Sequence, residues 1–335
     1  MKLRTLAFPV FALILLQASP SVAATRSVTD APFNARPDMK MFEDAAIMGG
    51  STALVSLSNV FTAPDVGKAI VIAGAGPNAG VLATTIRTVT GPHAATIGTA
   101  ASTSVSKVRA AYGTDDTPAF QAALDAQGKG GGGEVSIPTG AFLLLGTLTL
   151  PRFVRLHGEL MLASSLIGAL PGNQFPGEGP MDGGTTLGMV EGFGDAAARP
   201  FLTVNTNAVV EGIAIYNPLQ TNAENVPAPT PGPWAVDMIG NADRVSNVNL
   251  VNVYQGIRAW SGVRHWMDHI TGSPPSRVSV WTTAGMWTGW SRFSSSRSST
   301  TIQLSWAAPS VWAASGSGSS SMAPPSRLAG TINSG

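Results

Sequence analysis

The chain has 335 residues and a mass of 34.3 kDa, with 20 basic side chains, 19 acidic side chains and no cysteine. Apolar residues make up 44% and charged residues only 12%, which excludes a highly charged disordered chain, and a net charge of +1 gives no broad basic surface for nucleic acid. The missing cysteines exclude disulfides, thiol catalysis and cysteine-ligated metal centres.

The first 24 residues have the three-part layout of a secretory signal peptide. Two basic residues open the segment, Leu6–Leu16 is an apolar run, and small residues lead to a cleavage point after Ala23 or Ala24. The run is shorter than the roughly 20 residues that a membrane-spanning helix needs. We therefore predict that residues 1–24 are a signal peptide and that the mature protein is secreted or periplasmic, with no membrane anchor.

Residues 25–111 alternate short β-branched runs with turns that contain glycine or proline. Val55–Val60 largely alternates apolar and polar side chains, and Lys68–Ile72 and Thr85–Val89 are rich in residues that favour strands. The pattern predicts a small β-rich N-terminal segment.

A helix signal follows. Asp115 and Asp116 precede Thr117 and Pro118, a combination typical of a helix start, and Gly130–Gly133 ends the pattern. The apolar face consists of Phe120, Ala123 and Leu124. We interpret the two aspartates as capping groups that offset the helix dipole, and not as a catalytic pair.

After residue 133 the apolar period changes from 3.6 to 2. Short strands are predicted at 134–137, 141–145, 147–150, 154–156, 159–162, 201–204, 209–215, 236–238 and 245–253. No helical pattern lies between them, which disfavours a doubly wound α/β sheet. Glu211–Asn217 and Ser246–Asn252 share a weak repeat that stacked turns of parallel strands would produce. A sandwich of antiparallel hairpins also fits this periodicity.

Four stretches resemble a known family: Gly113–Leu124, Gly131–Gly140, Gly146–Pro151 and Val154–Gly158. With weaker similarity across most of residues 105–273, they resemble the pectate lyase superfamily, and most of all its rhamnogalacturonase/epimerase-like pectate lyase domains. The resemblance implies an all-β fold: a right-handed parallel β-helix over residues 112–273, with the helix capping its open end.

The resemblance also implies a polysaccharide partner, because the superfamily contains polysaccharide lyases, glycoside hydrolases and non-catalytic glycan-binding spikes. We expect an enzyme of the hydrolase or lyase type acting on pectin-like or other acidic glycans, or else a binding module. No resident cofactor is expected, although a lyase would use a divalent cation such as calcium. The catalytic motifs that polygalacturonases carry in later coils are absent in that order.

Candidate catalytic residues come from the polar side chains after residue 200. Sugar hydrolysis uses two carboxyl groups, whereas elimination uses a base and a cation beside the uronate. Asp237 lies between two apolar residues, which places it on the polar face of a strand. Arg264, His265 and Asp268 belong to the densest polar cluster. We predict Asp237 and Asp268 as the acid and base, with His265 or Arg264 stabilising charge, and no metal site, since no third ligand is evident.

Three aromatic side chains are candidate sugar contacts. Tyr216, Trp234 and Tyr254 lie in or beside the predicted strands, and their rings suit stacking on a sugar. Each fits equally well as a core residue or a loop anchor.

The composition changes after residue 273. Residues 274–335 contain no acidic residue but five of the eight tryptophans, and strand alternation ends. A serine-rich disordered tail is one interpretation. A reading-frame slip near Ser273 is another, because permitted codons for Pro275–Ser295 read in a shifted frame restore strand alternation and acidic residues. A frame slip would remove later coils, so we expect weak or absent activity, or an inactive truncated product.

Overall fold

The computed structural model describes residues 25–160, 184–220, 229–259 and 261–273, and four strands between residues 278 and 306. The predicted signal peptide lies outside the described residues. Strands dominate the described part of the chain, which confirms the predicted β-rich class. No helix in that part is long and apolar enough to cross a membrane.

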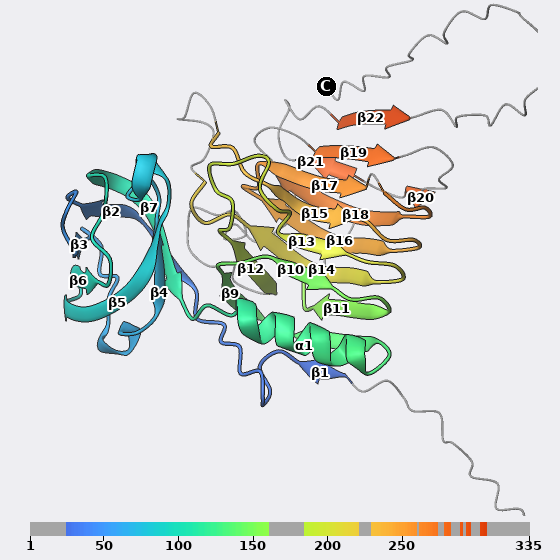
Figure 1. The fold of residues 1–335 in the computed structure, drawn as a ribbon, viewed down its shortest axis with the longest axis horizontal. Helices are drawn as coiled ribbons and strands as arrows, with labels where there is room; N and C mark the ends of the chain where they lie inside the picture. Colours follow the sequence, from blue (N-terminus) through green and yellow to red (C-terminus); the bar gives the residue numbers. More distant parts are fainter. Residues whose placement is uncertain are drawn as a thin grey trace, which may run out of the picture.

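A closed antiparallel barrel forms one unit of the structure (Figure 1). Its strands, in order around the barrel, are β2 (Lys40–Ile47), β3 (Ala53–Val55), β6 (Ala94–Ile97), β5 (Leu82–Gly91), β4 (Ala69–Ile72) and β7 (Val105–Gly113). Short 3₁₀ turns, η1 (Ala63–Asp65) and η2 (Pro77–Ala79), lie between strands. Phe42, Phe61 and Tyr112 pack inside, with the Phe42 and Phe61 ring centroids 5.6 Å apart. Closure pairs the edge strands, which the local sequence pattern did not predict.

The segment before the barrel belongs to the second unit. β1 (Arg26–Ser27) pairs in parallel with β8 (Gly133–Ile137), and Val28 packs into the core of that unit. The structure therefore divides the predicted segment 25–111 between two units. A two-residue strand carries no periodic signal, so the sequence pattern could not separate it.

Two parallel sheets make up the second unit. The larger contains, in order, β1, β8, β11 (Val154–Gly158), β14 (Val209–Tyr216), β16 (Arg244–Val251), β18 (Trp266–Ser273) and β20 (Gly289–Trp290), with β9 (Gly140–Leu144), β12 (Thr185–Met189) and β21 (Phe293–Ser295) paired beside them. The smaller contains β10 (Leu148–Leu150), β13 (Leu202–Val204), β15 (Trp234–Met238) and β17 (Gln255–Ala259). β19 (Val278–Thr282) and β22 (Ile302–Trp306) form a separate parallel pair.

From β13 to β18 the strands of the two sheets alternate along the chain, and each of β13 to β16 pairs with the strand one circuit later (Figure 1). Contacts between neighbouring circuits span 21 residues from Asp237 to Arg258 and 22 residues from Asp243 to His265. Because these strand pairs are parallel, the alternative of an antiparallel hairpin sandwich is wrong. β19 to β22 lie within the predicted tail, and the rest of residues 274–335 lies outside the described residues.

α1 (Thr117–Lys129) is the predicted helix, and it lies along one end of the strand stack (Figure 1). Phe120, Ala123 and Leu124 are fully buried in the core that the two sheets share. The Phe120 ring meets Phe142 edge to face, with centroids 5.3 Å apart. The helix therefore covers apolar side chains that the first circuit would otherwise expose.

The start of α1 differs from the predicted cap. Asp115, and not Asp116, accepts hydrogen bonds through Oδ1 from the Thr117 N–H at 3.1 Å and the Thr117 hydroxyl at 2.7 Å. Asp116 accepts instead from the backbone N–H of Arg36 at 2.8 Å, and its Oδ2 is buried with no partner among the described residues. Burial, with the nearby charges of Asp38 and Asp115, raises the pKa of Asp116 to about 7.

Replacement of Phe120 by alanine tests the sealing role of α1. We expect Phe120→Ala to lower the free energy of unfolding by roughly 3–5 kcal/mol, because it leaves a cavity between helix and sheets. Urea unfolding measures the change. Lys129→Ala, at the exposed end of the same helix, is the control and should cost far less. A loss of under about 1 kcal/mol for Phe120→Ala would contradict the sealing role.

The buried carboxyl of Asp116 predicts a pH-dependent stability. Its folded pKa of about 7 exceeds the ordinary value of 3.8, so the folded chain holds a proton that the unfolded chain loses as pH rises between these values. Stability therefore falls by up to roughly 4 kcal/mol from pH 4 to pH 8 through this group. Asp116→Asn removes that fall, as unfolding at both pH values would show. Asp125→Asn, at an exposed position, should leave the fall in stability unchanged. The same pH dependence in Asp116→Asn as in the unmodified chain would refute the assignment of this fall to Asp116.

Candidate functional site

The structure does not bring the predicted acid and base together. Asp237 lies on β15 in the smaller sheet, whereas Asp268 lies on β18 in the larger sheet. Arg264 is exposed in the turn before β18, with a φ of 63°. Strand alternation predicts the face on which a side chain lies, but not the sheet to which the strand belongs.

His265 is fully buried beneath the turn before β18. Its Nδ1 contacts Asp243 Oδ1 on the preceding circuit, and its Nε2 lies 2.9 Å from the carbonyl oxygen of Ser261. Both ring nitrogens are therefore engaged. His265 ties two consecutive circuits together and does not face solvent, where a catalytic group must meet a polysaccharide.

Asp237 is held by an arginine on the next circuit. Arg258 Nε lies 3.0 Å from Asp237 Oδ1, and Arg258 Nη2 lies 2.5 Å from Oδ2. The guanidinium also lies 5.6 Å from the ring centroid of the partly exposed Trp234. The Asp237 side chain is 7% exposed. Both carboxylate oxygens of Asp237 are engaged by one guanidinium, which leaves neither open to take or give a proton, whereas the ring and the guanidinium suit binding.

The other two aromatic candidates occupy different surroundings. Tyr216 is 1% exposed, and its hydroxyl donates to Met41 Sδ of the barrel at 3.0 Å. Burial raises its pKa above the ordinary value. Tyr216 therefore packs between the barrel and the larger sheet. Tyr254, which precedes β17, is partly buried.

A row of polar side chains crosses the larger sheet. We call it the polar row, and its members are the successive register partners Ser136, His157, Glu211, Ser246 and Asp268. The residues immediately before them are buried in the shared core: Val135, Leu156, Val210, Val245 and Met267. Because side chains alternate along a strand, the polar row lies on the outward face of the sheet.

Glu211 is the most strongly bound member of the polar row. Its Oε1 contacts Arg155 Nη2 and lies 3.0 Å from His157 Nδ1. Arg155 also donates to Glu134 Oε2 at 2.6 Å. Burial alone would raise the pKa of Glu211, but the hydrogen bond and charge of Arg155, with the charge of His157, hold it below the usual value. Glu211 is therefore ionised at neutral pH.

The next two positions of the row carry unsatisfied polar atoms. Ser246 Oγ and Asp268 Oδ1 are buried and have no hydrogen-bond partner among the described residues. Asp268 Oδ2 lies 2.9 Å from His269 Nδ1. Ser246 and Asp268 are direct register partners, so the unsatisfied atoms lie on neighbouring strands. Buried groups of this kind usually bind water or a ligand hydroxyl.

The arrangement provides two carboxyl groups on one face. Glu211 and Asp268 lie two strands apart in the same register, which places their Cα atoms about 9–10 Å apart. A separation of this order leaves room for a water between two carboxyl groups. The described residues contain no group of three acidic or histidine side chains that could hold a metal ion.

Asp268 was predicted from its sequence pattern, whereas Glu211 and its partners Arg155 and His157 were not. Glu211 and Ser246 occupy equivalent positions in the 35-residue repeat, and this equivalence was the available signal. Arg155 and His157 lie more than 50 residues before Glu211 along the chain. No sequence period marks that pairing.

Comparisons with family models and with curated proteins find no match to this chain. Among solved structures, it is similar to a candidate glycosyl hydrolase from Parabacteroides merdae, with 13% identity, a TM-score of 0.33, and coverage of 59% of this chain and 90% of the other. A capsular polysaccharide depolymerase, the tailspike gp49 of Acinetobacter baumannii bacteriophage Fri1, shows 12% identity, a TM-score of 0.31, and coverage of 70% and 40%. The tailspike gp49 of Pseudomonas phage LKA1 shows 11% identity, a TM-score of 0.18, and coverage of 76% and 46%.

Proposed function

We propose that the mature chain is an exported, right-handed parallel β-helix protein that hydrolyses an acidic polysaccharide. The polar row carries this proposal, because it holds Glu211 and Asp268 on one outward face at a separation that suits sugar hydrolysis. The circuits of 21 residues from β15 to β17 and 22 residues from β16 to β18, with the resemblance to the pectate lyase superfamily, support the fold and the substrate class.

In the proposed reaction, Glu211 acts as the base and Asp268 as the acid. Arg155 and His157 keep Glu211 ionised, so it can take a proton from a water that attacks the anomeric carbon. Asp268 gives its proton to the departing glycosidic oxygen. The unsatisfied hydroxyl of Ser246 lies between the two carboxyl groups in the register and can hold the water. Attack from the face opposite the leaving group inverts the anomeric centre.

Export rests on the predicted signal peptide. Recovery of a mature chain that begins after Ala23 or Ala24 would support it, and an intact Met1 on the exported chain would refute it. A frame slip near Ser273 would remove groups that later coils contribute to the site, so we propose that turnover is slow.

A second candidate function is glycan binding without cleavage. Trp234, Asp237 and Arg258 present an aromatic ring beside a guanidinium on the smaller sheet, away from the polar row. Such a surface suits a sugar ring with a carboxylate.

Removal of either carboxylate tests hydrolysis. We expect Glu211→Gln and Asp268→Asn each to reduce release of reducing ends from an acidic polysaccharide at least about 100-fold, because each removes one proton transfer. Glu159→Gln, an exposed carboxylate just after β11, is the control and should retain activity. Equal activity in all variants would contradict the catalytic assignment. An unsaturated product would show elimination in place of hydrolysis. Binding that only Trp234→Ala weakens, without cleavage, would favour the second candidate.

A further inference from the structure

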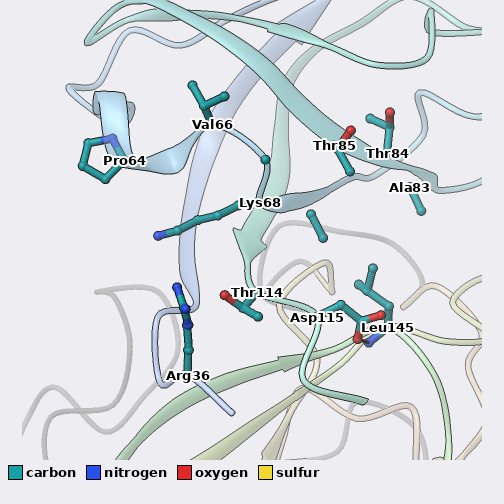
Figure 2. Close-up of a pocket in the computed structure, with 12 residues that line it drawn as sticks. Arg36, Pro64, Val66, Lys68, Ala83, Thr84, Thr85, Thr114, Asp115 and Leu145 are labelled. Atoms are coloured by element: carbon teal, nitrogen blue, oxygen red, sulfur yellow. Dashed lines mark hydrogen bonds between the residues drawn. The ribbon is translucent and has the colours of Figure 1, made fainter. Parts of the chain in front are cut away.

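A cavity of about 660 Å³ opens where the barrel meets the parallel sheets (Figure 2). The barrel contributes Pro64, Val66, Lys68 and Thr85, and the other unit contributes Arg36, Thr114, Asp115 and Leu145. This volume lies within the range of small-molecule binding sites. The cavity is separate from the polar row, and nothing in the proposed hydrolysis uses it.

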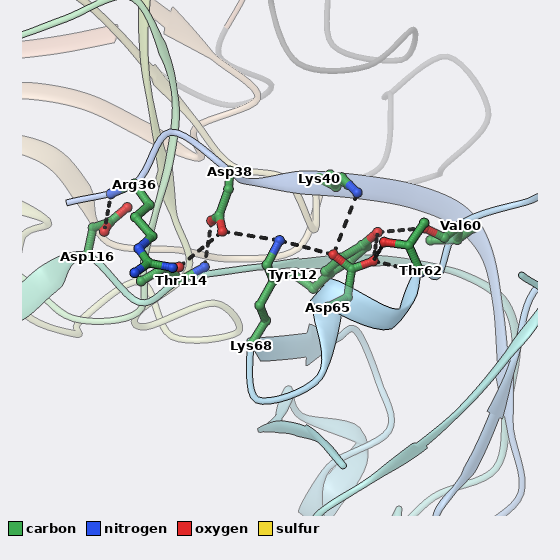
Figure 3. A network of polar contacts seen from close by, with 10 residues as sticks. All are labelled: Arg36, Asp38, Lys40, Val60, Thr62, Asp65, Lys68, Tyr112, Thr114 and Asp116. Carbon is green, nitrogen blue, oxygen red and sulfur yellow. Dashed lines mark hydrogen bonds and ion pairs between the residues drawn. The ribbon is translucent and has the colours of Figure 1, made fainter. Parts of the chain in front are cut away.

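One wall of the cavity is fixed by a network of ion pairs (Figure 3). Lys68 Nζ lies 3.1 Å from Asp38 Oδ2 and 3.0 Å from Asp65 Oδ1. Asp38 Oδ1 in turn accepts the Thr114 N–H at 2.7 Å. Burial alone would lower the pKa of Lys68, but its bonds to Asp65 and Asp38 outweigh burial and raise it. Lys68 is therefore a positioned, permanently charged group.

The backbone of Arg36 is held by a hydrogen bond, whereas its side chain has no hydrogen-bond or ion-pair partner among the described residues. Its N–H donates to Asp116 at 2.8 Å, and its guanidinium is exposed. Figure 2 shows the end of the Arg36 side chain near that of Lys68, and Figure 3 shows the Lys68 amine directed toward Asp38 and Asp65. Lys68 is already paired with Asp38 and Asp65, so Arg36 is the cation of the described lining that is open to an anion. The planar guanidinium can pair at two points with a carboxylate or a phosphate.

The rest of the lining suits hydroxyl groups. Asp115 binds Thr117 and the Leu145 N–H through Oδ1, which leaves Oδ2 as an acceptor. The hydroxyl of Thr85 has no hydrogen-bond partner among the described residues. The charge of Asp115 disfavours a doubly charged anion such as phosphate dianion more than a single carboxylate that is accompanied by several hydroxyl donors. A ligand that carries one carboxylate and several hydroxyls matches both features.

We propose that this cavity binds a carboxylate-bearing sugar unit, with its carboxylate on the Arg36 guanidinium and its hydroxyls against Asp115 and Thr85. The site would hold an acidic glycan at the junction of the two units without cleaving it. Because its test measures binding, its failure leaves the hydrolysis proposal untouched.

Titration of the full mature chain with D-galacturonate, followed by ligand-observed NMR, tests the site. We expect saturable binding that Arg36→Ala weakens at least about 10-fold, because a charge-assisted bidentate pair is lost. Arg36→Lys should recover part of the affinity, since it restores the charge without the fork. Arg87→Ala, an exposed arginine of the barrel outside the cavity, is the matched control and should bind normally.

Three results would overturn the proposal: no saturable binding of galacturonate, unchanged affinity in Arg36→Ala, or binding of neutral galactose or inorganic phosphate as tight as that of galacturonate. Thermal unfolding checks that each variant is folded. The Arg36 guanidinium has no partner to lose within the described structure, so the Arg36 variants should unfold at the temperature of the unmodified chain.

Discussion

The register between successive parallel strands is the constraint on which the second unit depends. Each circuit packs directly on the next one. The inward side chains at equivalent positions of successive circuits must therefore all be apolar. Leu156, Val210, Val245 and Met267 form such an inward column. Alternation then places their following neighbours outward, so the same register that builds the core also assembles the polar row.

A stack of this kind exposes its first circuit, and α1 covers that end. The helix carries Phe120, Ala123 and Leu124 into the shared core, while Asp115 ties the start of the helix to Leu145 after β9. The chain enters this region from the barrel, so the barrel is held against the strands near the same point. The cavity lined by Arg36 and Lys68 lies in this junction, where the closed barrel meets the parallel sheets.

Local patterns predicted what is local in this chain. The helix over 117–129 follows from its start, its apolar face and its glycines, and alternation predicted the outward position of Asp237. The pairing of strands that are distant along the chain could not be predicted from the sequence pattern. The barrel closes through antiparallel pairs such as Ile70 with Tyr112, which no sequence period marks. Glu211 is identified as a candidate base only by its contacts with Arg155 and His157. Asp237 is separated from Asp268 because their strands belong to different sheets.

Cysteine cross-linking across one register position tests the central claim most directly, because the chain has no cysteine of its own. His157 and Glu211 are register partners on neighbouring strands, about 5 Å apart at Cα, which suits a disulfide. The double variant His157→Cys/Glu211→Cys should form the intramolecular disulfide on mild oxidation. His157→Cys/Val209→Cys, on the same face but two residues out of register and about 8 Å apart, should not. A disulfide in the out-of-register variant would contradict the register and with it the polar row. The absence of a disulfide from both variants, when both are folded, would contradict them as well.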